Sequence, residues 1–157
     1  MSMSPAAVAN AAIFDDPALY RGVLSRRFAA FLVDATIIAT LTVLGWLLFL
    51  VLGIITFGLT WLALGLVFPA VALGYSAFSL GGPYSSTWGM RLMGLEMRVW
   101  DGSRMYVLLA AVHALLFWAS VTVLTPLVLL VALFDGKRRL LHDLMLGTVL
   151  VNTRHAN

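Results

Sequence analysis

The chain has 157 residues and a net charge of +3, with ten Lys or Arg and seven Asp or Glu residues. Hydrophobic residues make up 62% of it and charged residues 11%, whereas soluble proteins average about 45–50% and about 25%. Because so little charge cannot cover a soluble surface, the composition excludes an ordinary soluble domain and indicates a membrane protein. The absence of cysteine also excludes disulfides and thiolate chemistry.

Residues 1–20 are small and polar, and we expect a flexible or surface-lying N-terminal tail. They lack the basic start and apolar core of a signal peptide. The first apolar segment is therefore expected to stay in the protein as an uncleaved anchor.

The first apolar run covers residues 28–52 and follows Arg21, Arg26 and Arg27. About 20 apolar residues suffice for a membrane-spanning helix, so this run predicts one. Its only charge is Asp34. Residues 53–58 are few and uncharged, so the second run, at about 59–80, is predicted to turn straight back as an antiparallel helix.

Residues 81–104 are more polar, and their Arg residues outnumber their acidic ones. Basic residues also precede the first helix, so both segments, and with them the N-terminus, are expected in the cytoplasm. Apolar and charged side chains alternate over residues 95–100, before an Asp101-Gly102 turn signal, which predicts a short strand.

Residues 105–134 form a long run without charge. One straight helix would measure about 45 Å against a hydrocarbon core of about 30 Å. A single tilted or partly interfacial helix would place the C-terminus outside. Two later features favour the inside instead: the basic cluster Lys137-Arg138-Arg139 and a second strand-like run at residues 148–151. We therefore expect a re-entrant hairpin with helices at about 105–121 and 126–134.

Together these elements predict an all-α transmembrane fold, a small bundle of 3–4 membrane-inserted helices. The membrane domain would cover residues 21–152, with a short cytoplasmic element resembling a β-hairpin and a C-terminal tail at residues 153–157.

Asp34 is the most informative residue, because a charge inside an apolar helix costs several kcal/mol without a partner, water or a proton. Arg27 shares its helix face about 10 Å away along the axis and is expected to snorkel to the lipid headgroups. A further partner must come from elsewhere. Asp34 would then handle an ion or a proton, or it would be a structural clasp between helices.

His113 is the only other titratable group within an apolar run. It is a candidate partner of Asp34 or a proton relay, and the alternative is a hydrogen-bonded packing residue.

The basic residues that flank the apolar runs indicate topology and contact with anionic lipids, and we expect no nucleic-acid partner. These residues are Arg21, Arg26, Lys137, Arg138 and Arg139. The pair His142-Asp143 lacks further ligands at metal-binding spacing, so no metal or cofactor is predicted. The sequence has no nucleophile elbow, P-loop or dinucleotide fingerprint, and we expect no enzyme.

Several motifs resemble the RDD family of bacterial membrane proteins. They are RFAAFLVD at residues 27–34, STWGMRLMGL at 86–95, Asp101-Gly102, and LHD at 141–143 followed by GTV at 147–149. The resemblance covers roughly residues 20–152. It implies that Arg27 and Asp34 are the first two signature residues, and that Asp143, or alternatively Asp135, is the second aspartate.

The chain departs from the family pattern at Met90, where relatives often have Lys, and at His113, where many have Arg. The resemblance implies a multi-pass protein of the bacterial cytoplasmic membrane. Transport has been suggested for the family, including cation/proton exchange for some members.

Two functions follow as hypotheses. The first is a small transporter or an ion- or proton-exchange component that uses Asp34 and works as a homo-oligomer. The second is a non-transporting accessory, assembly or scaffold subunit that packs against another membrane protein.

Overall fold

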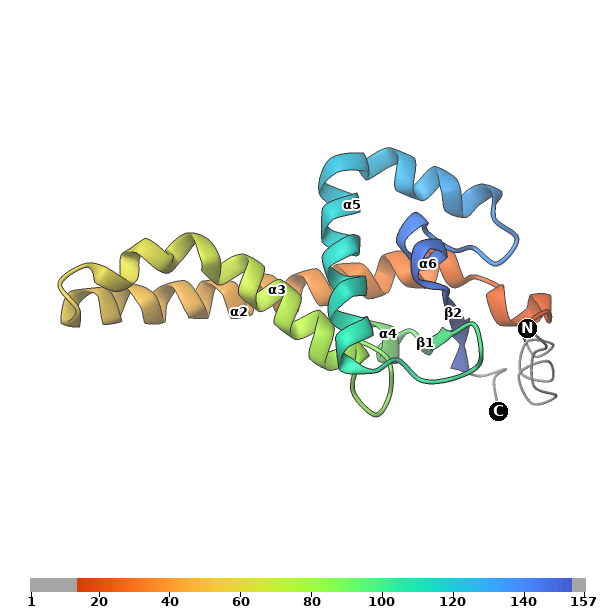
Figure 1. Ribbon diagram of the computed structural model, residues 1–157, viewed down its shortest axis with the longest axis horizontal. Helices are drawn as coiled ribbons and strands as arrows, with labels where there is room; N and C mark the ends of the chain where they lie inside the picture. The colour runs from red at the N-terminus through yellow and green to blue at the C-terminus, as the bar shows by residue number, and fades with distance from the viewer. Residues whose placement is uncertain (1–13, 154–157) are drawn as a thin grey trace.

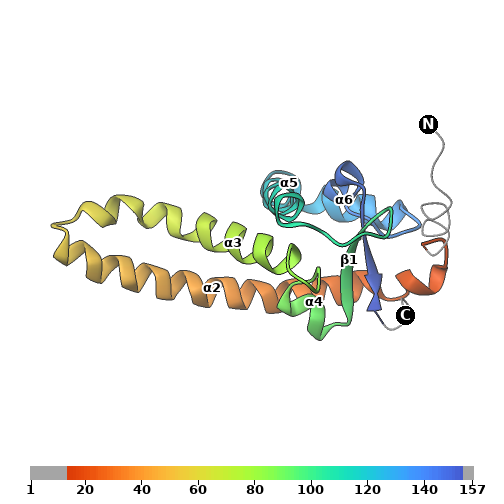
Figure 2. The ribbon, with the colours of Figure 1, turned by 60° about the horizontal axis from the view of Figure 1, so that its bottom comes forward.

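The computed structural model describes residues 14–153, without the side chains of residues 121, 123–134 and 141. Two helices form its elongated part, α2 (Val23–Ile55) and α3 (Leu64–Leu80), and they are joined by the 3₁₀ helix η2 (Leu59–Ala63). Figures 1 and 2 show α2 and α3 side by side along the long axis of the molecule. They form the antiparallel hairpin expected from the short uncharged turn, and α2 extends beyond the predicted 28–52 at both ends.

The turn of the hairpin is closed by an aromatic ring. Gly53 lies directly against the ring of Trp61, where a Cβ atom would overlap the indole. The indole N–H of Trp61 donates to the carbonyl oxygen of Leu50 at 3.3 Å, and that of Trp46 donates to Leu64 at 3.0 Å. Both indoles therefore find acceptors inside the hairpin without water.

By length and composition, two described segments could cross a membrane: Pro17–Ile55 and Leu59–Leu80. The apolar helix Val107–Ser120 is shorter. The described residues thus contain two candidate spans, fewer than the 3–4 inserted helices that the sequence suggested.

The expected pair of helices at about 105–121 and 126–134 is instead one continuous helix, α5 (Val107–Phe134). Figure 1 shows that it lies crosswise to α2 and then bends sharply, so that its blue half runs back towards the N-terminal end of α2. Pro126 lies within α5, and a proline in a helix interior lacks the N–H for one backbone hydrogen bond, which favours a bend. The predicted break between two helices near residues 122–126 is therefore wrong, because the chain changes direction within one helix.

A two-stranded antiparallel sheet joins distant parts of the chain. Strand β1 (Leu95–Val99) pairs with β2 (Thr148–Asn152), and Met97 lies opposite Leu150. The two predicted strands are confirmed, but they do not form a hairpin, because α5 and α6 (Leu141–Leu146) lie between them in the chain. A short helix, α4 (Trp88–Leu92), precedes β1.

Both faces of this sheet are covered. Leu150, with Leu95 and Met97, packs against Val23 of α2 and Leu80 of α3.

On β2, the neighbours of Leu150 point the other way, because side chains alternate along a strand. Val149 and Val151 form a second cluster with Phe14, Leu19 and Tyr20. Leu19 and Tyr20 belong to the 3₁₀ helix η1 (Pro17–Tyr20). Residues 14–20 are therefore packed on the sheet, so that of our two alternatives for the tail the surface-lying one holds for them and the flexible one does not. Residues 1–13 and 154–157 of the predicted tails lie outside the described residues.

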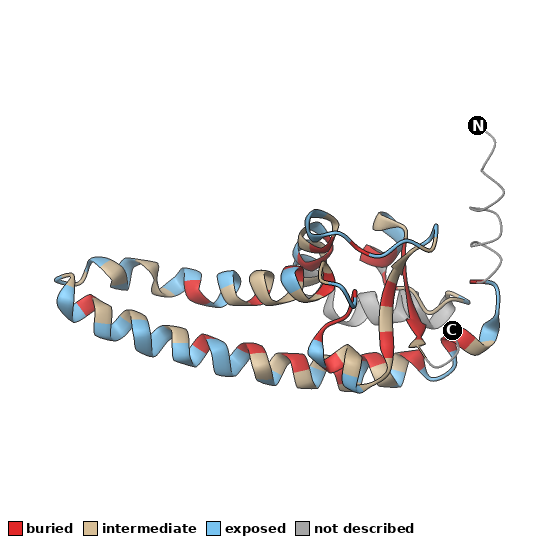
Figure 3. Cartoon of the chain, turned by 90° about the horizontal axis from the view of Figure 1, so that it is seen from below, coloured by how far each residue is buried: buried red, intermediate tan, exposed pale blue. Residues whose placement is uncertain are grey.

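We call residues 35–74 the hairpin, and residues 14–34 with 75–153 the head. Figure 3 shows buried positions gathered in the head and exposed ones along much of the hairpin. Near the hairpin tip, Ile54 is 73%, Phe57 99% and Leu62 83% exposed. Such a surface is stable in contact with lipid and would be an unusually large apolar patch in water.

Candidate functional site

Asp34 lies on α2 where the hairpin meets the head, and three donors surround its carboxylate. Its Oδ1 accepts from the hydroxyl of Tyr75 at 2.6 Å and from the backbone N–H of Gly89 at 2.8 Å. Its Oδ2 accepts from the hydroxyl of Thr87 at 2.6 Å. The contacts come from α3 and from the first turn of α4, so this one side chain joins three helices.

The sequence of α4 explains how it approaches so closely. Thr87 caps the helix, and its Oγ accepts from the N–H of Met90 at 3.2 Å while its own hydroxyl donates to Asp34. Gly89 faces the backbone of α2, where a Cβ atom would overlap the carbonyl oxygen of Ala30. Both residues belong to the STWGMRLMGL motif, and their types are therefore set by the contact with α2.

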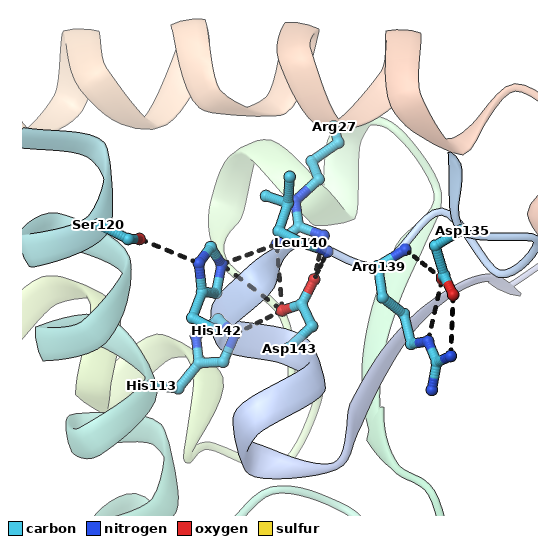
Figure 4. Close-up of polar contacts among 8 residues, drawn as sticks. All are labelled: Arg27, His113, Ser120, Asp135, Arg139, Leu140, His142 and Asp143. Carbon is cyan, nitrogen blue, oxygen red and sulfur yellow. Dashed lines mark hydrogen bonds and ion pairs between the residues drawn. The ribbon is translucent and has the colours of Figure 1, made fainter. Parts of the chain in front are cut away.

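A second cluster, shown in Figure 4, is built around Asp143 of α6, whose side chain is completely buried. Arg27 donates from Nη1 to Oδ2 at 2.6 Å and from Nη2 to Oδ1 at 3.2 Å. His113 Nε2 donates to Oδ1 at 2.8 Å, and the N–H of Leu140 donates to Oδ2 at 2.9 Å. Four donors thus hold one buried carboxylate.

These contacts determine the charge of Asp143. Burial on its own disfavours the carboxylate, but the positive charge of Arg27 and the hydrogen bonds from His113 and Arg27 outweigh it. The pKa of Asp143 therefore lies well below its usual range. The cluster contains a permanent ion pair between α2 and α6.

His142 completes the cluster in its neutral form. Its Nε2 lies 3.3 Å from Nη2 of Arg27, which can only donate, so Nε2 accepts and the proton is on Nδ1. Nδ1 then donates to the hydroxyl of Ser120 at 3.2 Å. Burial lowers the pKa of His142 to about 4, against a smaller opposing effect of Asp143.

The two clusters border one cavity of about 70 Å³ between α2, α3 and α5. Arg27 and Asp34 line it from α2 and Tyr75 lines it from α3. From α5 come His113 and Trp118. The rest of its wall is mainly apolar, including Phe31, Ile38, Ala114 and Phe117.

The structure corrects the partners expected for Asp34. Arg27 does not snorkel to the lipid headgroups: it is 9% exposed and binds Asp143, 116 residues later in the chain. His113, the candidate partner of Asp34, contacts Asp143 instead. The sequence analysis missed Tyr75, Thr87 and Gly89. The signal in the sequence is a threonine, a residue type that often caps helices, two positions before Gly89.

The structure distinguishes the two candidates for the second aspartate. Asp143 pairs with Arg27, whereas Asp135 accepts three hydrogen bonds from Arg139, from its backbone N–H, Nε and Nη2 at 2.9, 3.0 and 2.9 Å. That local contact lowers the pKa of Asp135.

The basic residues that we expected to contact lipid headgroups differ in their contacts within the protein. Arg139 is engaged by Asp135, and Lys137 binds Asp15 at 2.9 Å. Arg21 is exposed, and it lines an open pocket together with Arg138. Arg26 is half-buried.

His113, His142 and Asp143 also offer one ligand atom each within 4.8 Å of one another, a spacing that suits a metal ion. Arg27, however, donates to both oxygens of Asp143 and to Nε2 of His142. A cation would have to displace this guanidinium and leave it buried without its partner, which is strongly unfavourable. The positive charge that the cluster requires is therefore supplied by Arg27.

Comparison with known proteins gives one family. The model of the RDD family matches residues 21–147, a stretch that contains Arg27, Asp34 and Asp143. No curated protein and no solved structure matches the chain. The chain therefore belongs to the RDD family, a family of membrane proteins.

Proposed function

We propose that the protein is a multi-pass protein of the bacterial cytoplasmic membrane whose hairpin crosses the lipid while the head and N-terminus lie in the cytoplasm. From Asp34 to Ile55, α2 rises about 32 Å at about 1.5 Å per residue, close to the hydrocarbon thickness of about 30 Å. No Asp, Glu, Lys or Arg occurs between Asp34 and Arg91. The Lys and Arg residues of the described chain all lie in the head, which supports a cytoplasmic head.

This placement moves Asp34 from the middle of the membrane, where the sequence suggested it, to the level where head and lipid meet. There it is shielded from lipid by α3 and α4 and borders the cavity. An ion or proton could reach it from the cytoplasmic side without crossing the hydrocarbon.

For the protein's activity, we propose a small ion- or proton-exchange component in which Asp34 binds the transported ion or proton. The observation that carries this proposal is that Asp34 shares a cavity with Arg27 and His113 at the base of the hairpin. Ionisable residues inside membrane bundles commonly mark such pathways, because their burial is costly without a function.

The contacts of Asp34 are compatible with both of its protonation states. A proton taken up on Oδ2 would meet Thr87, whose hydroxyl oxygen can accept as well as donate. The donors on Oδ1, Tyr75 and Gly89, would stay in place. Proton uptake would thus require rotation of one hydroxyl and no movement of the backbone.

Two membrane-spanning helices cannot enclose an ion or proton path by themselves, so the proposal includes assembly with further copies or with another membrane protein. Exposed Arg21 and half-buried Arg26, beside the start of α2, are proposed to contact anionic lipid headgroups. We propose neither an enzymatic role nor a nucleic-acid partner.

One observation favours a second candidate function. The three hydrogen bonds that Asp34 accepts fasten α2 to α3 and α4. In a non-transporting accessory or scaffold subunit, Asp34 would be this clasp, and the apolar hairpin would pack against a larger membrane complex.

Asp34→Asn separates the two functions, because asparagine can keep the geometry. Its amide oxygen can accept from Tyr75 and Gly89, and its amide group can donate to Thr87. The titratable charge alone is lost. Purified protein in liposomes, with an internal pH dye and an imposed cation gradient, should show proton-coupled flux that Asp34→Asn abolishes.

Asp101→Asn is the matched control, since Asp101 is exposed in the loop after β1, and its flux should equal that of the wild type. Wild-type protein without flux, or Asp34→Asn with full flux, would sink the transport proposal. A stable larger complex that co-purifies with the wild type and with Asp34→Asn, which keeps the clasp, but is lost with Asp34→Ala would then support the scaffold.

A further inference from the structure

Two residues that line the cavity between α2, α3 and α5 carry polar atoms without a hydrogen-bond partner within the protein. Among the described residues, His113 Nδ1 and Trp118 Nε1 are buried and have no hydrogen-bond partner. Both rings line the cavity, and His113 is only 3% exposed. Buried polar groups without partners are rare in folded proteins because desolvation without a hydrogen bond is costly. The two atoms therefore point to a hydrogen-bonding ligand at this site.

The hydrogen-bonding roles of these atoms are fixed by their neighbours. His113 Nε2 carries a proton, since it lies 2.8 Å from Oδ1 of Asp143, which can only accept. In the neutral ring, Nδ1 is then an acceptor. Trp118 Nε1–H can only donate. Asp34 can accept a further hydrogen bond, because its carboxylate offers about four lone-pair sites and the three donors occupy three of them.

A ligand for this cavity must therefore donate and accept hydrogen bonds at once. A metal cation fails because it would face the indole N–H, and an anion fails because it would face Asp34 and the Nδ1 lone pair. Water meets both requirements. A water molecule needs about 10–15 Å³ of such space, so the cavity of about 70 Å³ has room for at least two.

We propose that this cavity is a water-binding site in which water accepts from Trp118 Nε1–H and donates to His113 Nδ1 and to Asp34. The water would join the two polar clusters into one hydrogen-bonded chain from Asp34 through His113 to Asp143 and Arg27. His142 and Tyr75 are the other titratable groups beside this chain. The presence of water is independent of the proposed exchange function; its use as a proton route to Asp34 rests on that function.

The chain's five tryptophans provide an internal test by solid-state NMR in liposomes. With ¹⁵N-labelled tryptophan, magnetisation transferred from water reports which indole N–H groups contact it. Trp46 is the dry reference, because its N–H is bonded to Leu64 inside the hairpin. Trp88 and Trp100, 57% and 55% exposed on the head, are the wet references.

We expect the indole N–H of Trp118, assigned with Trp118→Phe, to receive water magnetisation like that of Trp88 although its Nε1 atom is buried. In ¹⁵N-histidine samples, His113 Nδ1 should show the shift of a hydrogen-bonded nitrogen. Ala114→Leu adds apolar volume to the cavity without touching a polar contact, and it should remove both signals of water.

The wild-type measurement decides the proposal even where Ala114→Leu does not fold. An indole of Trp118 as dry as that of Trp46, or one in contact with lipid acyl chains, would overturn the water site. Flux is not part of this experiment. A dry cavity in a protein with flux refutes only the water site, and a wet cavity in a protein without flux refutes only the exchange function.

Discussion

The polar side chains of the head and of the hairpin find their hydrogen-bond partners in different parts of the chain. In the head, buried charges meet partners from distant parts of the chain, as Arg27 meets Asp143. In the hairpin, polar side chains bond within their own helix pair. The hydroxyls of Thr36, Thr40 and Thr42 each donate to the carbonyl four residues earlier, at 2.9, 2.9 and 2.7 Å.

This contrast has a physical reason. A lone helix pair in lipid has no third element to supply polar partners, so every group must be satisfied locally. The head has several elements around each buried charge, so it can hold an ion pair that would be unstable alone. The head should therefore depend on particular residues, and the hairpin on its apolar character.

The strongest test of the head is Asp143→Ala. It leaves Arg27 buried without its counter-ion and the N–H of Leu140 without an acceptor. We expect a loss of about 3–5 kcal/mol in the free energy of unfolding of the head. Denaturant unfolding in micelles, followed by near-UV circular dichroism, measures it.

Asp135→Ala is its control, because Asp135 makes a partly exposed ion pair with Arg139 four residues away. That change should cost less than about 1 kcal/mol. The double variant Arg27→Met, Asp143→Leu should regain part of the stability, since it also removes the buried guanidinium, while the N–H of Leu140 stays without its acceptor. If Asp143→Ala were no worse than Asp135→Ala, the buried pair would not hold the head.

The hairpin is tested by Leu48→Arg. Leu48 is 57% exposed on α2, at a depth where we expect lipid. An arginine at the centre of a spanning helix costs about 2.5–3.5 kcal/mol in insertion. The fraction of protein that resists alkaline extraction from membranes should fall, while unfolding of the head in micelles stays unchanged.

Leu48→Ala, which removes volume but adds no charge, should insert almost as the wild type does. Normal insertion of Leu48→Arg would argue that this face of α2 does not meet lipid. An unfolded head in micelles would argue that the two regions are not independent.

Gly89→Ala tests the contact that joins Asp34 to α4. The added Cβ would overlap the carbonyl oxygen of Ala30 and push α4 away from α2. Overpacking of this kind costs about 1–3 kcal/mol. Gly74→Ala is the matched control, because nothing lies within 4 Å of a Cβ atom there. Thermal unfolding should separate the two variants, and equal stability would contradict the close approach of α4.

The sequence predicted the parts of this structure that depend on local patterns. Apolar runs marked α2 and α3, alternation marked β1, and a strand-like run marked β2. Asp34 stood out because charges are rare in such runs, and Arg27 because it shares the helix face of Asp34. The resemblance offered Asp143, with Asp135 as the alternative, as the second aspartate, and the structure shows what each of them binds.

The partners themselves could not be predicted, because they depend on how separate elements pack. Arg27 and Asp143 are 116 residues apart, and Asp34 and Gly89 are 55 apart. Thr87 was visible as a helix cap, but nothing local indicates that its hydroxyl proton points to Asp34. The bend of α5 was misread as a reversal, because a proline in an uncharged run fits either.

The smallest predicted effect concerns His142 and pH. Its pKa of about 4 in the folded head lies below the value of about 6.5 expected in the unfolded chain. Between these values the unfolded state binds the proton more readily, so stability is complete above pH 6.5 and falls as the pH falls towards 4. Asp143 adds little to this slope, because its pKa is low and the unfolded carboxyl titrates near pH 4.

From pH 7.5 to 5.5, His142 should cost the head about 1 kcal/mol of unfolding free energy. His142→Gln can keep both contacts, with its oxygen accepting from Arg27 and its amide donating to Ser120, but it cannot titrate. Its unfolding free energy should therefore depend less on pH over this range, and the difference from the wild type isolates His142 from the other two histidines. Parallel pH profiles would mean that His142 is protonated in the folded head, and then Arg27 could not be its donor.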